Sequence, residues 1–102
     1  MSQEKKQFFL KLIPPRPTFA MDMSDEERKI MQEHIVYWNG LLNQGIVIVY
    51  GPVMDSKGPY GMGVLEVDDE NLVREIQVND PSVKAGLNTI EIYPMRAITK
   101  KN

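Results

Sequence analysis

The sequence predicts an α+β fold in which a four-stranded antiparallel sheet carries its helices on one face. Three observations lead to this prediction. The chain has 102 residues, the size of a single domain, which leaves little room for a second core. Apolar residues make up 42 % and charged residues 25 %, as in ordinary globular proteins. Segments with strand and helix patterns follow one another in the order β-α-β-β-α-β.

The first strand is predicted over residues 7–13, which are rich in aromatic and branched side chains. Pro14-Pro15 ends it. Residues 14–23 contain three prolines and have no regular period. We expect a loop there, stiffened because each proline fixes its φ angle.

A long helix is predicted over residues 25–43. Ser24 and Glu27 match a capping box, in which Ser24 caps the helix and the Glu27 side chain reaches back to the Ser24 backbone N–H. Gly45 supplies the stop signal. Between these limits the apolar residues recur at helical spacing: Ile30, Met31, Ile35, Trp38, Leu41 and Leu42.

Two strands joined as a hairpin are predicted to follow the helix. Residues 46–50 form a continuous apolar run typical of a buried strand, and Gly51-Pro52 ends or bends it. Turn residues occupy 55–59, and residues 60–67 predict the next strand. The glycines in this second strand suggest that another group approaches the backbone closely.

The last part of the chain predicts a second helix, a short helical turn and a final strand. The helix begins at Asp68 and ends near Asn79. Asp80 then caps a new turn that has Pro81 at its first position and stops at Gly86. Residues 88–98 predict the fourth strand.

This order of elements is that of the ferredoxin-like fold, with both helices on one sheet face. The other face then needs a cover. A second copy of the chain is the simplest cover, so we expect a homodimer with the two sheets face to face.

His34 and Asp80 are the candidate catalytic residues. His34 lies on the apolar stripe of the long helix, where a lone histidine is more often a core residue, although its titration near neutral pH suits a general acid or base. Asp80 alone fits a helix cap. If it faced His34, its carboxylate would fix the imidazole tautomer and raise its basicity. Ser56 and Ser82 fit turn residues better than nucleophiles, so the pair indicates proton transfer rather than acyl-enzyme chemistry.

Several other residues are candidates for binding a substrate. Arg16, in the proline-rich loop beside Thr18, could hold a carboxylate through two hydrogen bonds; the alternative is a solvated loop cation. The remaining expected substrate contacts are Trp38, Gly51, Pro52 and Tyr60.

Composition excludes several classes of function. The chain has no cysteine, which rules out disulfides, thiolate nucleophiles, Fe–S clusters and cysteine-based zinc sites. With one histidine it cannot form a histidine metal cluster, and we expect neither a metal nor a cofactor. The net charge of −2, without a basic cluster, argues against nucleic acid or an anionic membrane as partner. No apolar run is long enough for a signal peptide or a membrane span, so we expect a cytoplasmic protein.

A family resemblance adds to these inferences. His34 in the long helix, Gly51-Pro52 after the second strand, and Asn79-Asp-Pro-Ser-Val-Lys-Ala-Gly-Leu87 before the last strand together resemble the YCII-related (YciI-like) domain family over about residues 7–98. The resemblance implies a dimeric α+β barrel and a His–Asp active site. The wider superfamily includes muconolactone isomerases and cofactor-free monooxygenases, and one YciI-like branch includes a dehydrochlorinase acting on a chlorinated muconolactone. The Pro14–Met23 loop is longer than the family pattern and could roof a pocket.

We therefore expect one domain over residues 1–102, acting as a cofactor-independent enzyme. His34 would be the general acid or base and Asp80 would orient it. The reaction would be isomerisation or elimination, including dehydrohalogenation, of a lactone-like or anionic small molecule. The alternative is a non-catalytic, dimeric small-molecule-binding or accessory domain that uses the same pocket.

Overall fold

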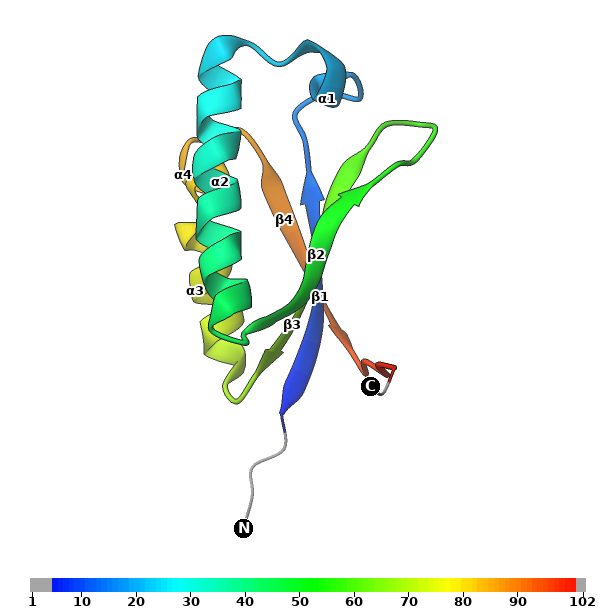
Figure 1. The fold of residues 1–102 in the computed structure, drawn as a ribbon, viewed down its shortest axis with the longest axis vertical. Helices are drawn as coiled ribbons and strands as arrows, with labels where there is room; N and C mark the ends of the chain where they lie inside the picture. Colours follow the sequence, from blue (N-terminus) through cyan, green and yellow to red (C-terminus); the bar gives the residue numbers. More distant parts are fainter. Residues whose placement is uncertain (1–4, 101–102) are drawn as a thin grey trace.

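A sheet and a layer of helices make up the protein, and the computed structural model describes residues 5–100 (Figure 1). The elements in chain order are β1 (Lys6–Ile13), α1 (Phe19–Asp22), α2 (Asp25–Asn43), β2 (Val47–Val53), β3 (Tyr60–Val67), α3 (Glu70–Asn79), α4 (Pro81–Lys84) and β4 (Thr89–Met95). All strand pairs are antiparallel, in the order β2-β3-β1-β4. Figure 1 shows α2, α3 and α4 together on one side of the sheet. This architecture confirms the predicted fold class.

β1, the first strand of the chain, lies inside the sheet between β3 and the last strand, β4. Phe8 pairs with Leu65 of β3 on one side and with Pro94 of β4 on the other. β2 and β4 are the edge strands. An edge strand tolerates proline because one row of its N–H groups has no partner strand. For this reason β2 runs through Gly51 and Pro52 as far as Val53, so of the two alternatives expected from the sequence, Gly51-Pro52 does not end the strand.

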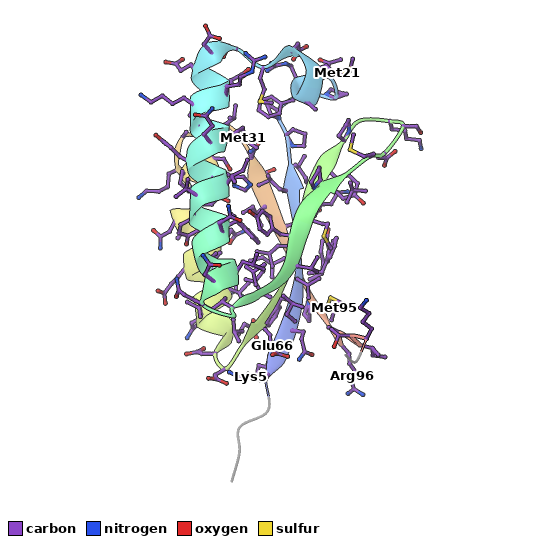
Figure 2. The ribbon with its side chains drawn as sticks, in the orientation of Figure 1. Lys5, Met21, Met31, Glu66, Met95 and Arg96 are labelled. Atoms are coloured by element: carbon purple, nitrogen blue, oxygen red, sulfur yellow. The ribbon has the colours of Figure 1, made fainter. Side chains whose placement is uncertain are left out.

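The long helix α2 begins as its sequence predicted. The Glu27 backbone N–H donates to Ser24 Oγ at 3.1 Å, and the Ser24 N–H donates to Glu27 Oε1 at 2.9 Å, so both halves of the capping box are present. The helix ends at Asn43, and Gly45 follows with a positive φ of 79°. Most polar tips of its side chains project away from the sheet (Figure 2).

The core lies between α2, α3 and the near face of the sheet. Alternation along β1 sends Phe8 and Leu10 into it and places Phe9 on the opposite face. The buried apolar cluster consists of Phe8, Leu10, Trp38, Leu41, Val47, Leu65, Val67, Val73, Ile76 and Ile90. This cluster is the hydrophobic core of the described residues.

The opposite face of the sheet, away from α2, α3 and α4 (Figure 1), carries an apolar patch beside polar side chains such as Lys11, Glu66 and Glu91. Phe9 pairs with Val64 and Tyr93 across the strands, and the Phe9 and Tyr93 rings lie 6.1 Å apart. Val49, paired with Val64, is 49 % exposed. We call this surface, defined by Phe9, Val49, Val64 and Tyr93, the outer face.

The structure differs from the sequence prediction at two further places. Residues 14–23 were expected to be a loop throughout, but the single-turn helix α1 forms inside them, because Phe19 is buried and Asp22 accepts a hydrogen bond from Thr18. The last strand ends at Met95 rather than at residue 98, because pairing with β1 ends where Met95 faces Gln7.

Gly63 of β3 makes room for the Trp38 indole. A Cβ at Gly63 would lie 2.5 Å from Trp38 Cζ3, closer than real contacts allow. We predict that Gly63→Ala lowers the free energy of unfolding by about 1–3 kcal/mol, since overpacking forces the indole to move. Urea unfolding followed by Trp38 fluorescence measures this, because Trp38 is the only tryptophan.

Gly40→Ala is the matched control. No atom lies within 4 Å of a Cβ placed at Gly40, which sits inside α2. This change should instead stabilise the protein by up to about 1 kcal/mol through helix propensity. Equal effects at both positions would contradict the steric role of Gly63.

Candidate functional site

A buried carboxylate joins the helices at the centre of the candidate site. Asp80 ends α3 and caps α4, and it is 0 % exposed. Its Oδ2 accepts from Trp38 Nε1 at 2.6 Å and lies 2.8 Å from His34 Nδ1. Its Oδ1 accepts from the Ser82 backbone N–H and the Ser82 hydroxyl, both at 2.8 Å. The structure thus brings the two predicted catalytic residues into contact although they are 46 positions apart in the sequence.

The charge of this carboxylate determines the state of the imidazole. Burial raises the pKa of Asp80, but the hydrogen bonds from His34, Trp38 and Ser82, with the attraction to His34, outweigh it and leave the pKa lowered. An ionised carboxylate only accepts hydrogen bonds. Nδ1 of His34 must therefore be the donor, and in the neutral imidazole Nε2 carries the free lone pair.

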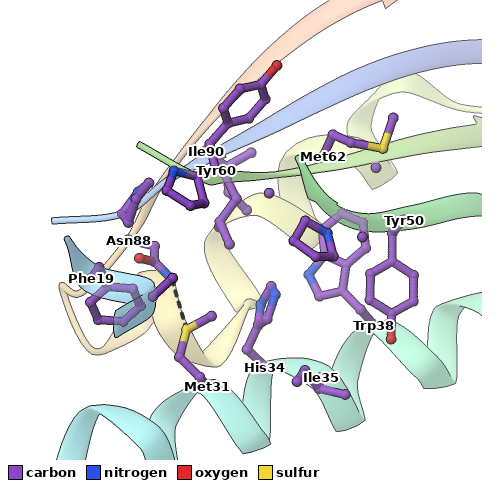
Figure 3. A pocket seen from close by; sticks show the side chains of 18 of the residues that line it. Phe19, Met31, His34, Ile35, Trp38, Tyr50, Tyr60, Met62, Asn88 and Ile90 are labelled. Atoms are coloured by element: carbon purple, nitrogen blue, oxygen red, sulfur yellow. Dashed lines mark hydrogen bonds between the residues drawn. The ribbon is translucent and has the colours of Figure 1, made fainter. Parts of the chain in front are cut away.

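A cavity of about 440 Å³ lies between α2 and the near face of the sheet. His34 projects into it from α2 (Figure 3), and no described residue forms a hydrogen bond with its Nε2. The Trp38 and Tyr50 rings, 5.7 Å apart, form part of the wall. The lining consists of Leu10, Leu12, Pro14, Phe19, Ala20, Met23, Met31, His34, Ile35, Trp38, Tyr50, Gly51, Pro52, Pro59, Tyr60, Gly61, Met62, Gly63, Asn88 and Ile90. The cavity is an apolar chamber with few polar groups.

The predicted substrate contacts divide into two groups in the structure. Trp38, Gly51, Pro52 and Tyr60 all line the cavity, the last three because β2 and β3 run along its side. Arg16 and Thr18 are not among its lining residues. The proline-rich loop does form a wall of the cavity, but through its apolar residues.

Arg16 is engaged within the protein. Its Nε donates to Asp22 Oδ1 at 2.8 Å, and its two terminal nitrogens donate to the Glu27 oxygens at 2.9 and 2.8 Å. Its guanidinium carbon also lies 5.3 Å from the centre of the Phe19 ring. This cluster fastens α1 to the first turn of α2 and holds Phe19 against the cavity. The geometry favours this structural role over the expected carboxylate anchor.

Asn88, Met31 and Tyr50 are lining residues that the sequence reasoning did not select. Asn88 is 2 % exposed, and its Nδ2 donates to Met31 Sδ at 3.2 Å. Its Oδ1 is the only buried side-chain nitrogen or oxygen of the described residues that has no partner. An asparagine at the start of a strand fits a turn residue, and nothing local in the sequence signals this environment.

The described residues contain no group of three or more His, Cys, Asp or Glu side chains that could hold a metal ion. No helix among residues 5–100 is both long and apolar enough to cross a membrane.

The antiparallel sheet in the order β2-β3-β1-β4, with helices on one face, defines a ferredoxin-like α+β fold. The YCII-related domain matches residues 7–96, and the chain belongs to this family. No curated protein sequence matches the chain.

The solved structures that are similar to it include the following two. One is 5-chloro-2-hydroxyhydroquinone dehydrochlorinase (TftG) from Burkholderia phenoliruptrix AC1100, in complex with 2,5-dihydroxybenzoquinone. It is 22 % identical, with a TM-score of 0.63 over 87 % of this chain and 93 % of that chain. The other is NE2512, a protein of unknown function from Nitrosomonas europaea, 12 % identical with a TM-score of 0.48 over 99 % of both chains. The first of these shows the fold.

The Arg16 cluster generates a prediction for acid stability. Hydrogen bonds from the Arg16 guanidinium and the Ser24 backbone lower the pKa of Glu27 from 4.5 to about 2. The folded state therefore holds this proton less tightly than the unfolded state does. The resulting stability is present above pH 4.5 and is lost as the pH falls towards 2. We expect the stability difference between wild type and Glu27→Gln to shrink over this window, measured by urea unfolding at several pH values.

Glu26→Gln is the matched control, because it removes a carboxylate from the same helical turn but none that contacts the guanidinium. Its stability difference from wild type should change less over the same window. Parallel pH profiles for the two variants would contradict the role assigned to Glu27.

Proposed function

We propose that this protein is a cofactor-independent enzyme in which His34 moves a proton on a small molecule bound in the cavity. One observation carries the proposal. His34 Nδ1 lies 2.8 Å from a fully buried carboxylate, which leaves Nε2 as the free nitrogen on the cavity side. A base held in a fixed tautomer by a carboxylate is the arrangement that general acid–base catalysis uses.

The reaction that best fits is isomerisation or elimination. Nε2 takes a proton from the substrate and becomes an imidazolium beside Asp80. In isomerisation the same proton returns at another atom. In dehydrohalogenation at a saturated carbon, the electrons of the broken C–H bond form a double bond, and the halide leaves with the electrons of its bond to carbon. In a chlorinated hydroxylated ring, a proton first moves from a hydroxyl oxygen to the ring carbon that bears chlorine. Loss of a second hydroxyl proton then forms a carbonyl, and chloride leaves with the electrons of its bond to carbon. Among residues 5–100, no serine, threonine or lysine lines the cavity as a nucleophile, and the Ser82 hydroxyl donates to Asp80. Proton transfer is therefore favoured over acyl transfer.

The substrate class follows from the cavity and from the structural neighbour. A lactone-like or other ring compound, neutral or anionic, fits a chamber of about 440 Å³ with aromatic walls. The neighbour TftG is described as a dehydrochlorinase and holds 2,5-dihydroxybenzoquinone. Its substrate, 5-chloro-2-hydroxyhydroquinone, is the first compound to test here.

With that compound, we expect wild-type protein to release chloride and His34→Ala to be slower by about 10²–10⁴-fold, the usual contribution of a general acid or base. Ser56→Ala should keep full activity, because Ser56 lies in the β2–β3 turn and outside the cavity lining. Chloride release and product analysis measure both. Full activity in His34→Ala would contradict the proposal. Binding that raises Tm without turnover of this or other ring substrates would favour the alternative, a non-catalytic binding or accessory domain.

Asp80 is proposed as a positioning residue, so its test needs a readout besides rate. Imidazole ¹⁵N chemical shifts report the tautomer, and they are unambiguous because the chain has one histidine. Wild type should show the Nδ1–H form when neutral. Asp80→Asn replaces one of the two accepting oxygens with an NH2 group, which cannot accept from the donors that surround Asp80. The imidazole then loses its fixed partner, so we expect a mixture of the two tautomers and slower turnover. An unchanged tautomer with reduced rate would contradict the positioning role.

We also propose that residues 1–102 form one domain that pairs with a second copy through the outer face. Phe9, Val49, Val64 and Tyr93 are apolar and lie on the side away from α2, α3 and α4. Burying such a face is a common reason for two-fold association.

Light scattering coupled to size exclusion tests the pairing. We expect wild type to be a dimer and Val49→Lys to be a monomer, since the change places a charge on the outer face. Val36→Lys makes the same change at a 72 % exposed position of α2 and should remain a dimer. A monomeric wild type, or a dimer that survives Val49→Lys, would contradict this interface.

A further inference from the structure

The Asn88 amide is the one buried polar group near the cavity whose hydrogen-bonding capacity is almost unused. An amide offers two N–H donors and a carbonyl oxygen with two lone pairs. Here Nδ2 donates only to the Met31 thioether, a weak acceptor, and Oδ1 accepts from no described group. Buried polar atoms are nearly always paired, and an exception calls for a cause. Asn88 is itself a lining residue, which suggests that the missing partner is a ligand.

The position of Asn88 gives the ligand two separate polar contacts. Figure 3 shows Asn88 at the Phe19 end of the cavity, with Met31 between it and His34. The Asn88 side chain makes one hydrogen bond, to the Met31 sulfur, so a rotation that turns Oδ1 towards a ligand breaks only this weak bond. Nε2 of neutral His34 is the other contact. Both atoms are hydrogen-bond acceptors, and a complementary ligand must bring a donor to each.

The charges around the cavity restrict the class of ligand further. No lysine or arginine of the described residues lines it. Arg16, the nearest candidate from the sequence, is paired with Asp22 and Glu27. A carboxylate would therefore enter an apolar chamber without a permanent cation to pair with. An uncharged ligand avoids the free-energy cost of burying an unpaired charge.

We propose that Asn88 is a specificity-determining residue that binds a ligand hydroxyl through Oδ1. The ligand class is an uncharged ring compound with at least two hydroxyl groups, one directed to Asn88 and one to His34 Nε2. This inference rests on the site of the proposed function and selects the neutral members of its substrate class.

The test compares simple probes in binding assays that need no turnover. The probes are the three dihydroxybenzenes, their monomethyl ethers and 4-hydroxybenzoate, followed by Trp38 fluorescence and one-dimensional NMR. For wild type we expect the best dihydroxybenzene to bind about 3–10-fold more tightly than its monomethyl ether, the usual value of one hydrogen bond. It should also bind more tightly than 4-hydroxybenzoate. Tighter binding of the carboxylate, or no binding by any probe, would overturn the proposal.

Asn88→Leu, which has a similar shape, separates a binding role from a structural one. We expect it to lose the preference for the dihydroxybenzene over the ether. We also expect its ligand-free Tm to equal or exceed that of wild type, because the change removes an unpaired buried polar atom. A retained preference, or a clearly lower Tm with normal binding, would overturn the proposal. Asn88→Ala should lose the same preference and covers the case in which leucine does not fit.

The same assay distinguishes failure of this inference from failure of the proposed function. If Asn88→Leu binds the probes like wild type while His34→Ala does not, only the role of Asn88 fails. If His34→Ala binds them like wild type, the placement of Nε2 as a ligand contact in the ground state fails. The proposed function fails only if His34→Ala also releases chloride at the wild-type rate.

Discussion

The burial of one negative charge is the constraint on which the rest of this structure depends. A carboxylate with no exposed surface is costly to fold unless hydrogen bonds replace its hydration. Asp80 receives four of them, from two side chains of α2 and from the first turn of α4. The same bonds join α2 to the α3–α4 corner, so the position of the long helix and the state of the carboxylate are coupled. Trp38 can make its bond only because Gly63 leaves room for the indole.

Because of this arrangement, the effect of a substitution at Asp80 on catalysis is hard to separate from its effect on folding. Breaking the Asp80 cluster removes a helix contact and the orientation of His34 together. A loss of activity in an Asp80 variant alone would therefore say little about mechanism. The imidazole tautomer is informative because it reports the local hydrogen bond rather than the stability of the whole domain. The Arg16 cluster is a second group of charged residues that joins two helices. It lies outside the cavity and stabilises the part of the wall that Phe19 forms.

Sequence reasoning succeeded where the determining interactions are local and failed where they are not. The capping box and helical spacing predicted α2 correctly because both act within a few residues. The sequence left open whether β2 ends at Gly51-Pro52, because the edge position that accommodates Pro52 depends on the whole sheet. Arg16 looked like a free cation because its partner Glu27 lies in another element. The contact of His34 with Asp80 could be expected only through the family resemblance, and the unpaired Asn88 oxygen could not be expected at all.

The distribution of charge in the cavity sets a requirement on the proposed chemistry. When His34 takes a proton, the imidazolium is stabilised by Asp80, but the new negative charge on the substrate meets an apolar wall with no lysine or arginine. Among the described lining residues, His34 is the one side chain that can become a cation. The substrate must therefore spread the charge over its own atoms, through a conjugated ring or carbonyl, or discard it with a leaving group. A saturated substrate without either feature would not react here at a useful rate. This requirement and the two acceptor atoms at Asn88 and His34 point to the same compounds, conjugated rings that carry hydroxyl groups.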